Sequence, residues 1–377
     1  MRNTVLGAVV GIIAGTVIGA TLVAPHLIPP NQESSNDAGS KPAQDALVQA
    51  QMPVVQADVS WKMAAAYRGS LPQLGTLGKR IEKSIWRVSA GTVEIRFHEP
   101  GELVSRDHVF DALTDGRLDA AFSSPLLWAD KAPALALFGA VPFGPSAPEL
   151  LAWFSFGEGK TLYDSIYQKL GVHGVLCGIN TAQASGWFKK PIKTLDELKT
   201  KRVRIVGLGA EVFEKLGIET TDQRDGALMS ALDNDTVNGA IFAMPAVDHA
   251  LEFHRLAKHY YFPGWQQPTT LFDLVVNQER WDALTSIQQT QIETVCGDNV
   301  RYGLAESEAL QYGALKDFVK KGVEIHRWPT EIMEAFAKSW SEVVAERGEA
   351  DKTFKAVWAS LSAFRKDYAV WRDLNKL

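Results

Sequence analysis

One arginine in this chain stands where a small carboxylate could be recognised. Arg204 lies in residues 202–206, which read Arg-Val-Arg-Ile-Val and would alternate between two faces if they form a strand. A planar guanidinium can hold a carboxylate through two hydrogen bonds, and an arginine at the end of a parallel strand faces the crevice where α/β proteins bind ligands. The alternative is a surface arginine paired with Glu211 or Asp196. The pattern favours the carboxylate site.

Further candidate ligand-binding residues precede this arginine in a polar loop. Asn180 begins the loop, and Gln183 offers both a donor and an acceptor. Trp187 and Phe188 follow, and this aromatic pair can either line a ligand site or pack in the core. We therefore expect Asn180, Gln183 and Trp187 near Arg204, with the role of the tryptophan open between ligand wall and core.

The glycine turn that follows the arginine is the main argument for a nucleotide. Gly207-Leu208-Gly209 lies between a predicted strand and a predicted helix, as in a dinucleotide-binding loop. The third glycine of that motif is replaced by Val212, and no acidic residue stands at the expected distance. The sequence also contains no HExxH, GxSxG or GxxxxGK[ST]. We predict a tight turn near a ligand, and no enzyme.

Histidines and cysteines give little support for a metal site. His249, His254 and His259 are five residues apart, whereas ligands on one helical face need spacings of three or four. The two cysteines, Cys177 and Cys296, could pair, but two isolated buried thiols are the favoured interpretation.

Length and charge set the broad class of protein. The chain has 377 residues, of which 46% are hydrophobic and 22% charged, and this suits one large or two medium globular domains. The net charge of −5 argues against nucleic-acid binding, which needs a concentrated basic surface.

The N-terminal segment is predicted to reach a membrane. Residues 4–24 carry no charge, and at about 1.5 Å per residue such a helix would span roughly 30 Å, the thickness of a bilayer core. An uncleaved anchor is favoured over a cleaved signal within residues 1–28, and residues 29–57 read as a flexible linker. Gly7, Gly11, Gly15 and Gly19 would share one helix face and permit self-association, although glycine is also common in membrane helices.

Strand-like and helix-like segments alternate beyond the linker. Such alternation predicts α/β layers with mostly parallel strands. The predicted strands are residues 61–67, 93–97, 118–123, 172–178, 203–206, 237–242, 271–277 and 323–326. The predicted helices are residues 76–89, 107–114, 147–170, 210–216, 225–232, 246–256, 286–321 and 330–375.

Several motifs together resemble one protein family. They are WKM at 61–63, GELV at 101–104, VFDALTDGRLDAAF at 109–122, VPFG at 141–144, GWF at 186–188, RVRIVGLGAEVFEKLG at 202–217 and FHRLAKHYYFPGW at 253–265. The chain resembles the solute-binding subunit of tripartite ATP-independent periplasmic (TRAP) transporters, and within it the branch that binds 2-oxo acids and related monocarboxylates. The similarity extends from about residue 60 to at least residue 330.

The resemblance implies a fold of two α/β domains that close on a ligand by a hinge, crossed by a long helix within residues 286–321. Domain I would comprise residues 58–181 and 270–309, and domain II residues 182–269 and 310–377. Arg204 matches the family arginine that forms a salt bridge with the ligand carboxylate. Gln183 matches a glutamine that helps to hold a cation and the ligand.

Two departures from the branch pattern concern the same site. The branch usually has Glu-Trp before a Gly-Pro, and this glutamate helps to coordinate sodium; here residues 241–245 read Ile-Phe-Ala-Met-Pro, so Ile241 replaces the carboxylate. Leu126 and Leu127 stand where the branch tends to have a tyrosine pair before the residue matching Trp128. We expect a more apolar site with Trp128 and Phe242 on its walls, no cofactor, and sodium held weakly, by Gln183, if at all.

The predicted function is therefore capture of a small organic carboxylate outside the cytoplasm and its delivery to a TRAP permease in the inner membrane. The predicted location is the periplasm, with the N-terminal helix as a tether. The alternative is a membrane-anchored sensory or scaffold module that reuses the same fold, because a fold alone does not fix a function.

Overall fold

The computed structural model describes residues 57–374 of the chain. These residues lie within one compact unit, Val55–Leu377. The predicted membrane segment at residues 4–24, its glycines at positions 7, 11, 15 and 19, and the predicted linker up to residue 56 lie outside the described part. From residue 57 to residue 374, no helix is both long enough and apolar enough to cross a membrane.

The strands form two separate sheets. The first, sheet A, has the order β2-β1-β3-β10-β4, and the second, sheet B, has the order β11-β9-β5-β8-β6-β7. Sheet A contains β1 (Val59–Ala65), β2 (Val93–His98), β3 (Ala120–Ser123), β4 (Val172–Asn180) and β10 (Thr270–Asn277). Sheet B contains β5 (Trp187–Phe188), β6 (Arg202–Arg204), β7 (Glu219–Thr221), β8 (Gly239–Ala240), β9 (His259–Phe262) and β11 (Glu324–Arg327).

Both sheets are mixed rather than mostly parallel, so that part of the sequence-based expectation was wrong. In sheet A, β1 is parallel to β2 and β3, whereas β10 is antiparallel to β3 and β4. In sheet B, β6 is parallel to β7 and β8, and β9 to β11, whereas β5 is antiparallel to its neighbours. The chain leaves sheet A after β4 and returns in β10, and the returning strand runs against its neighbours.

Helices cover the sheets, and the three longest predicted helical runs are interrupted. The helices up to the end of β4 are α2 (Gly75–Val88), α3 (Val109–Thr114), α4 (Ala136–Gly139), α5 (Ala147–Phe156) and α6 (Gly159–Lys169). Those that follow are α7 (Leu195–Lys199), α8 (Leu208–Lys215), α9 (Asp225–Asp233), α10 (Pro245–Ala250), α11 (Gln278–Asp282), α12 (Ser286–Ala309), α13 (Gln311–Lys320), α14 (Thr330–Ala350) and α15 (Lys352–Leu374). The run 147–170 breaks at Gly157, the run 286–321 at Leu310 and the C-terminal run at Asp351.

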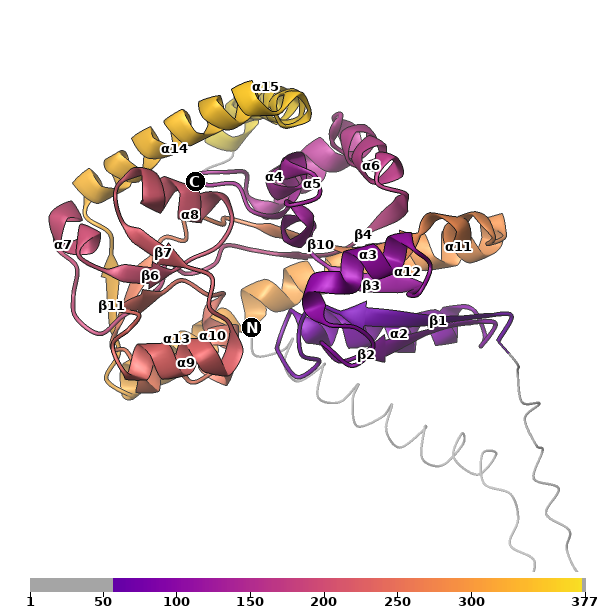
Figure 1. Cartoon of the computed structure of the whole chain (residues 1–377), viewed down its shortest axis with the longest axis horizontal. Helices are drawn as coiled ribbons and strands as arrows, with labels where there is room; N and C mark the ends of the chain where they lie inside the picture. The colour runs from indigo at the N-terminus through magenta and orange to yellow at the C-terminus, as the bar shows by residue number, and fades with distance from the viewer. Residues whose placement is uncertain (1–56, 375–377) are drawn as a thin grey trace, which may run out of the picture. The chain divides into compact units, whose positions relative to one another are not determined.

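The helical run after β10 passes from one sheet to the other. Helix α12 begins with a capping box of Thr285 and Gln288, in which each side chain bonds the other residue's backbone N–H. It packs against β4 of sheet A and against α2, the helix that connects β1 to β2. Helix α13 packs against α10, which follows β8 of sheet B. Figure 1 shows these two orange helices crossing from the side of β4 to the side of α10.

A disulfide bond joins this helix to the sheet beneath it. Cys177 on β4 and Cys296 on α12 are bonded to each other, and both are fully buried. The interpretation as two isolated thiols was wrong. The residues are 119 positions apart in the chain, so no local pattern reveals that they meet. Structural disulfides persist mainly in oxidising compartments, which agrees with the predicted location outside the cytoplasm.

The two C-terminal helices link the layers that cover the two sheets. Helix α14 packs on α8, whereas α15 packs on α4, α5 and α6 (Figure 1). Arg365 on α15 donates to the buried carboxylate of Glu149 on α5 at 3.2 Å. Phe354, Val357 and Leu361 form the buried face of α15. The last helix therefore lies on elements of the first half of the chain, although the resemblance would assign it to domain II.

Candidate functional site

A cavity of about 580 Å³ lies between the two sheets. Pockets that bind small molecules usually measure roughly 300–1,000 Å³. The lining side chains come from the ends of strands and the loops after them in both sheets. From the side of sheet A they include Tyr67, Arg68, Arg106, Phe110, Phe122, Leu126, Leu127, Trp128, Thr270 and Phe272, and from the side of sheet B Gln183, Arg204, Gly207, Thr221, Asp222, Arg224, Phe242 and Gln267.

Arg204 is a buried cation on the wall of this cavity. It is the last residue of β6, and its neighbour Val203 faces the core on the opposite side of the strand. The side chain is 7% exposed, and within residues 57–374 its hydrogen bonds go to two backbone carbonyls, Nε to Gln223 at 3.2 Å and a terminal nitrogen to Ile241 at 2.8 Å. Burial, and next the charge of Arg224, lowers its pKa to about 10, so it stays protonated at neutral pH.

The alternative pairing of Arg204 with a surface carboxylate was wrong. Glu211 accepts two hydrogen bonds from Arg347 on α14, at 2.7 and 2.8 Å. Asp196 lies 3.5 Å from Lys199, one turn along the same helix. The guanidinium of Arg204 therefore brings to the cavity a positive charge that neither of these carboxylates neutralises.

Phe242 adjoins Arg204, and Gln183 lines the same cavity. The backbone N–H of Gln183 donates to the carbonyl of Gln267 at 3.1 Å, and this fixes the loop that carries the glutamine side chain. Gly264 permits the loop to pass, because a Cβ there would lie 1.9 Å from the Gln183 carbonyl oxygen. The ring of Phe242 lies 4.8 Å from the Arg204 Cζ, which is a cation–π contact. Both predicted residues line the cavity.

Trp128 faces the same cavity from the other side. It ends a 3₁₀ turn, Pro125–Trp128, and its ring lies 5.1 Å from that of Phe110. Its indole Nε1 is buried without a hydrogen-bond partner in the described part of the chain. Because buried donors are nearly always paired, this unpaired N–H beside the cavity is a candidate donor to a ligand. Leu126 and Leu127 also line the cavity and make this wall apolar.

The glycine turn at Gly207 lies against Leu126 on the opposite side of the cavity. Gly207 has φ +65°, a conformation that favours glycine, and a Cβ there would lie 2.8 Å from Leu126 Cδ1. The turn after β6 thus touches the loop that carries Trp128. This close approach gives the turn a structural reason that requires no nucleotide.

Two predicted ligand residues do not line the cavity. Trp187 is fully buried within the core beside sheet B, where its ring stacks on Tyr260 at 3.9 Å and its Nε1 donates to Asp248 at 2.8 Å. Asn180, at the end of β4, is 2% exposed, and its carbonyl accepts from Thr269 at 2.7 Å. The Trp187 side chain belongs to the supporting core, whereas the Asn180 Oδ1 is buried without a hydrogen-bond partner in the described part of the chain, so a ligand role for Asn180 stays a prediction.

Other residues of the cavity were missed by the sequence analysis. Tyr67 and Arg106 line it from the side of sheet A, and Arg224 from the side of sheet B. Burial raises the pKa of Tyr67 to about 12, so its phenol remains a hydrogen-bond donor. Its position in the sequence could have identified Tyr67 as a cavity residue. Tyr67 follows the carboxyl end of β1, a parallel strand, and such ends form ligand crevices.

The donor set of the cavity gives little to a hard cation. Ile241 is 3% exposed and does not line the cavity, although its carbonyl accepts from Arg204. The carboxylates along the lining are all exposed, whereas the less exposed part offers the amide oxygens of the half-buried Gln183 and the buried Gln267. The exposed carboxylates are Asp107, Asp130, Glu214 and Asp222. Sodium and calcium bind best to several oxygens that include a carboxylate, so the buried residues fit such an ion poorly.

Two aspartates outside the cavity lining, Asp248 and Asp273, are buried in the core. Asp248 accepts hydrogen bonds from Trp187 and from the hydroxyl of Tyr260 at 2.9 Å. Asp273 on β10 accepts from the hydroxyls of Tyr163 at 3.0 Å and Tyr167 at 2.5 Å. Burial raises the pKa of each to about 7, against the lowering effect of these hydrogen bonds and, for Asp248, of the charge on Arg204.

These raised values predict that stability decreases as pH rises. Between roughly pH 4 and pH 7 the folded chain keeps protons on Asp248 and Asp273 that the unfolded chain has released, so the free energy of unfolding decreases with pH across this window. We expect Asp273→Asn, which has no proton to lose, to show a smaller loss of unfolding free energy between pH 5 and pH 8 than the wild type. Urea unfolding at both pH values measures the difference.

Two controls apply to this comparison. Asp282→Asn alters an exposed carboxylate and should leave the pH dependence unchanged. Burial lowers the pKa of His173, and this makes the free energy of unfolding increase with pH. The histidine is present in the wild type and in both variants, so its contribution cancels in the comparison. An Asp273→Asn protein with the same pH dependence as the wild type would contradict the prediction.

The chain is similar to proteins of one family. Residues 67–351 match the model of the family described as bacterial extracellular solute-binding protein, family 7. A protein described as a monocarboxylate 2-oxoacid-binding periplasmic protein of Nostoc sp. is 32% identical over 332 residues, which cover 88% of this chain and 89% of that protein.

Solved structures show the same two-domain α/β fold. A TRAP solute-binding protein of Bordetella bronchiseptica, with copurified calcium and picolinate, has a TM-score of 0.82 and 28% identity over 85% of this chain and 95% of its own. A second, from Pseudoalteromonas atlantica with bound sodium and pyruvate, has a TM-score of 0.80 and 28% identity over 84% of this chain and 97% of its own.

Proposed function

Because this chain belongs to family 7 of the bacterial extracellular solute-binding proteins, the DctP family, we propose that it captures a small monocarboxylate, such as a 2-oxo acid, and delivers it to a TRAP permease. The family is one of solute-binding proteins and not of enzymes, which supports binding of the ligand rather than its conversion. Relatives described as binding 2-oxo acids or pyruvate support the ligand class.

The observation that carries this proposal is the bonding of Arg204. Among the described residues this buried guanidinium hydrogen-bonds only to backbone carbonyls and forms no salt bridge with a carboxylate, and a ligand carboxylate would supply that partner. Gln183 would then accept or donate toward the ligand's second polar group, and Trp128 Nε1 and Tyr67 would donate from the opposite wall. These roles account for one charged group and one neighbouring polar group on the ligand.

The rest of the wall favours a ligand with an apolar tail. Phe122, Leu126, Leu127 and Phe272 present hydrocarbon to the cavity. Each methylene that a ligand buries there contributes about 0.8 kcal/mol, so longer 2-oxo acids should bind at least as well as pyruvate until the cavity is filled.

Closure of two domains would trap the ligand. The proposed domain I is residues 58–181 and 270–309, which contain sheet A, and domain II is residues 182–269 and 310–377, which contain sheet B. The chain passes between them at the end of β4, before β10 and near Leu310. The packing of α15 on α4 to α6 would tie the C-terminal helix to domain I, so motion would occur between α14 and α15.

The apolar segment at residues 4–24 is proposed to export the chain and to hold it at the inner membrane, close to the permease. Support comes from its length and lack of charge, and from a family that functions outside the cytoplasm. Fractionation of cells, followed by sequencing of the N-terminus, tests this: a chain that begins after residue 24 would contradict the tether.

A thermal-shift screen tests the ligand class. The protein is mixed with pyruvate, with 2-oxo acids of longer chain, and with the matching amides, which have the same shape without the charge. The acids should raise the unfolding temperature and the amides should not. Equal shifts from acids and amides, or no shift from any acid, would reject a carboxylate ligand.

Sodium is expected to have little effect on this binding. Ile241 offers no side-chain oxygen and the buried lining offers no carboxylate, so a cation would be held by amide and carbonyl oxygens alone. We expect the dissociation constant for pyruvate to change by less than about threefold when sodium chloride is replaced by choline chloride at equal ionic strength. Isothermal titration calorimetry measures it. A loss of binding without sodium, restored by sodium or calcium, would show that a cation completes the site.

A further inference from the structure

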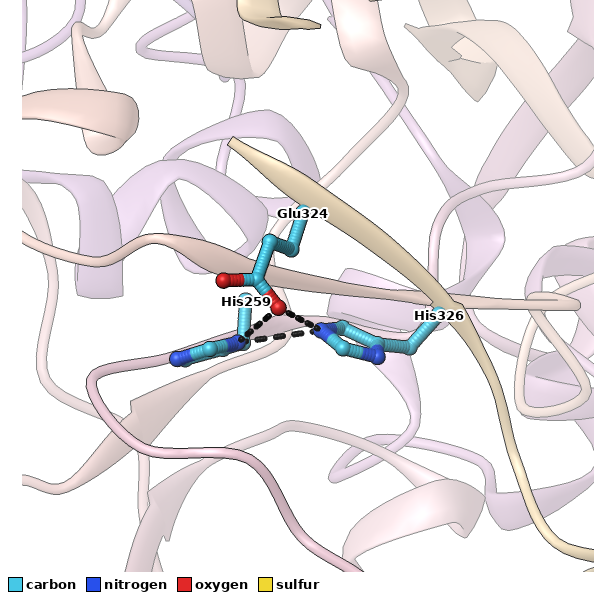
Figure 2. Close-up of side chains that lie close together, drawn as sticks. All are labelled: His259, Glu324 and His326. Carbon is cyan, nitrogen blue, oxygen red and sulfur yellow. Dashed lines mark hydrogen bonds and ion pairs between the residues drawn. The ribbon is translucent and has the colours of Figure 1, made fainter. Parts of the chain in front are cut away.

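A second group of ligating side chains lies away from the cavity, on the outer strands of sheet B. The register of β9 and β11 pairs His259 with Glu324 and Tyr261 with His326. Paired residues on neighbouring strands share a face, as do residues two apart on one strand, so His259, Glu324 and His326 project from the same face. Figure 2 shows the two imidazole rings meeting edge to edge beneath the Glu324 carboxylate. None of the three lines the cavity.

The distances between the three ligating atoms match one small metal ion. His259 Nδ1 lies 3.0 Å from His326 Nε2, and each nitrogen lies 3.6 Å from Glu324 Oε2. A point equidistant from the corners of a triangle with these sides is about 2.0 Å from each, and zinc bonds to histidine nitrogen and carboxylate oxygen measure about 2.0–2.2 Å. The three side chains therefore already place their ligating atoms at bonding distance from a common centre.

Hydrogen bonds alone satisfy this cluster only in part. One imidazole can donate to the other across 3.0 Å, but the carboxylate oxygen is 3.6 Å from both nitrogens, beyond the normal range for a direct bond. A cation, in contrast, accepts a lone pair from all three atoms at once.

We propose that His259, Glu324 and His326 form a binding site for one divalent transition-metal ion of the zinc class. Two imidazoles and one carboxylate suit zinc, copper or nickel, whereas calcium and magnesium prefer oxygen ligands alone. The Glu324 side chain is 66% exposed and the histidines 13% and 27%, so an ion can enter from solvent and a water can complete four-coordination.

The bound ion would link the edge strand β11 to its neighbour β9. Strand β11 is the last strand of sheet B and pairs only with β9 within that sheet. It also connects α13 to α14, so it anchors the C-terminal helices to the sheet. Metal that binds the folded chain stabilises it by mass action, and the proposed role is therefore structural and separate from carboxylate capture.

The test is titration of the metal-free protein, without a polyhistidine tag, with zinc by calorimetry and by thermal unfolding. We expect one zinc per chain and a higher unfolding temperature. His326→Ala and His259→Ala should weaken zinc binding on the order of 10–100-fold or more, since even residues that only support a ligand have effects of that size. Glu324→Gln, at an exposed position that does not threaten folding, should weaken it as well. Cobalt should give the visible absorption of a tetrahedral site, lost in the same variants.

Two matched variants separate this site from others. His249→Ala removes a half-exposed histidine that pairs with Asp317 elsewhere in the same half of the molecule, and it should bind zinc normally. Arg204→Ala alters the carboxylate cavity and should also bind zinc normally. The proposal is overturned if zinc does not bind, if the His259, Glu324 and His326 variants bind it as the wild type does, or if either matched variant loses it.

Discussion

Replacing Arg204 by alanine is expected to weaken 2-oxo acid binding by about 2–5 kcal/mol, a factor of roughly 30 to several thousand, because removal of one partner from a buried charge pair leaves the other without a counter-charge. The guanidinium is 7% exposed and keeps its charge at neutral pH, so bulk water does not compensate for its loss. Calorimetric titration of pyruvate into the wild type and the variant measures the change directly.

Arg202 supplies the matched control for this experiment. It lies two residues earlier on the same strand, but it pairs with Glu219 at 3.1 Å and does not line the cavity. Arg202→Ala should bind as the wild type does. Arg204→Lys keeps a charge without the planar fork and should fall between the two. If Arg204→Ala folds, by circular dichroism, and binds pyruvate as tightly as Arg202→Ala, the carboxylate does not bind at Arg204.

Removing the disulfide should cost the fold about 2–5 kcal/mol of unfolding free energy, since a cross-link between distant residues restricts the unfolded chain. Cys177 and Cys296 are 119 positions apart and fully buried, so the closed loop is long. Urea unfolding of the double variant Cys177→Ala/Cys296→Ala, compared with the wild type without reductant, measures the loss as a lower midpoint.

Two observations accompany this measurement. The wild type unfolded in the presence of reductant should approach the double variant, whereas the double variant should not respond to reductant. Pyruvate binding below the unfolding transition should be unchanged, because neither cysteine lines the cavity. Equal midpoints for the wild type and the double variant would show that the bond does not stabilise the fold.

Much of the fold could be predicted from sequence because helices and strands arise from local periodicity. Residues 76–89 carry apolar side chains at helical spacing, and α2 occupies Gly75–Val88 with Leu77, Ile81 and Ile85 buried. The interruptions were harder to predict. The run 286–321 contains no proline, yet its helix breaks at Leu310, where the chain passes between layers, and that break depends on tertiary contacts.

The candidate site was predicted in part for the same reason. Strand alternation singled out Arg204, and loop chemistry singled out Gln183; both line the cavity. Trp187 resembled a ligand residue by type, but an aromatic side chain serves a core as well as a binding site, and here it stacks on Tyr260 and donates to Asp248.

The sequence by itself determined the family, the arginine, and the order and approximate limits of most helices and strands, because each depends on residues close together in the chain. Strands β5, β7 and β9 were not predicted. Only the tertiary structure decided the contacts between distant residues: Cys177 with Cys296 across 119 positions, and His259 with His326 across 67. It also decided that Tyr67 and Arg106 share a cavity with Arg204. Such contacts depend on the path of the whole chain, and the spacing of residues along a sequence does not specify that path.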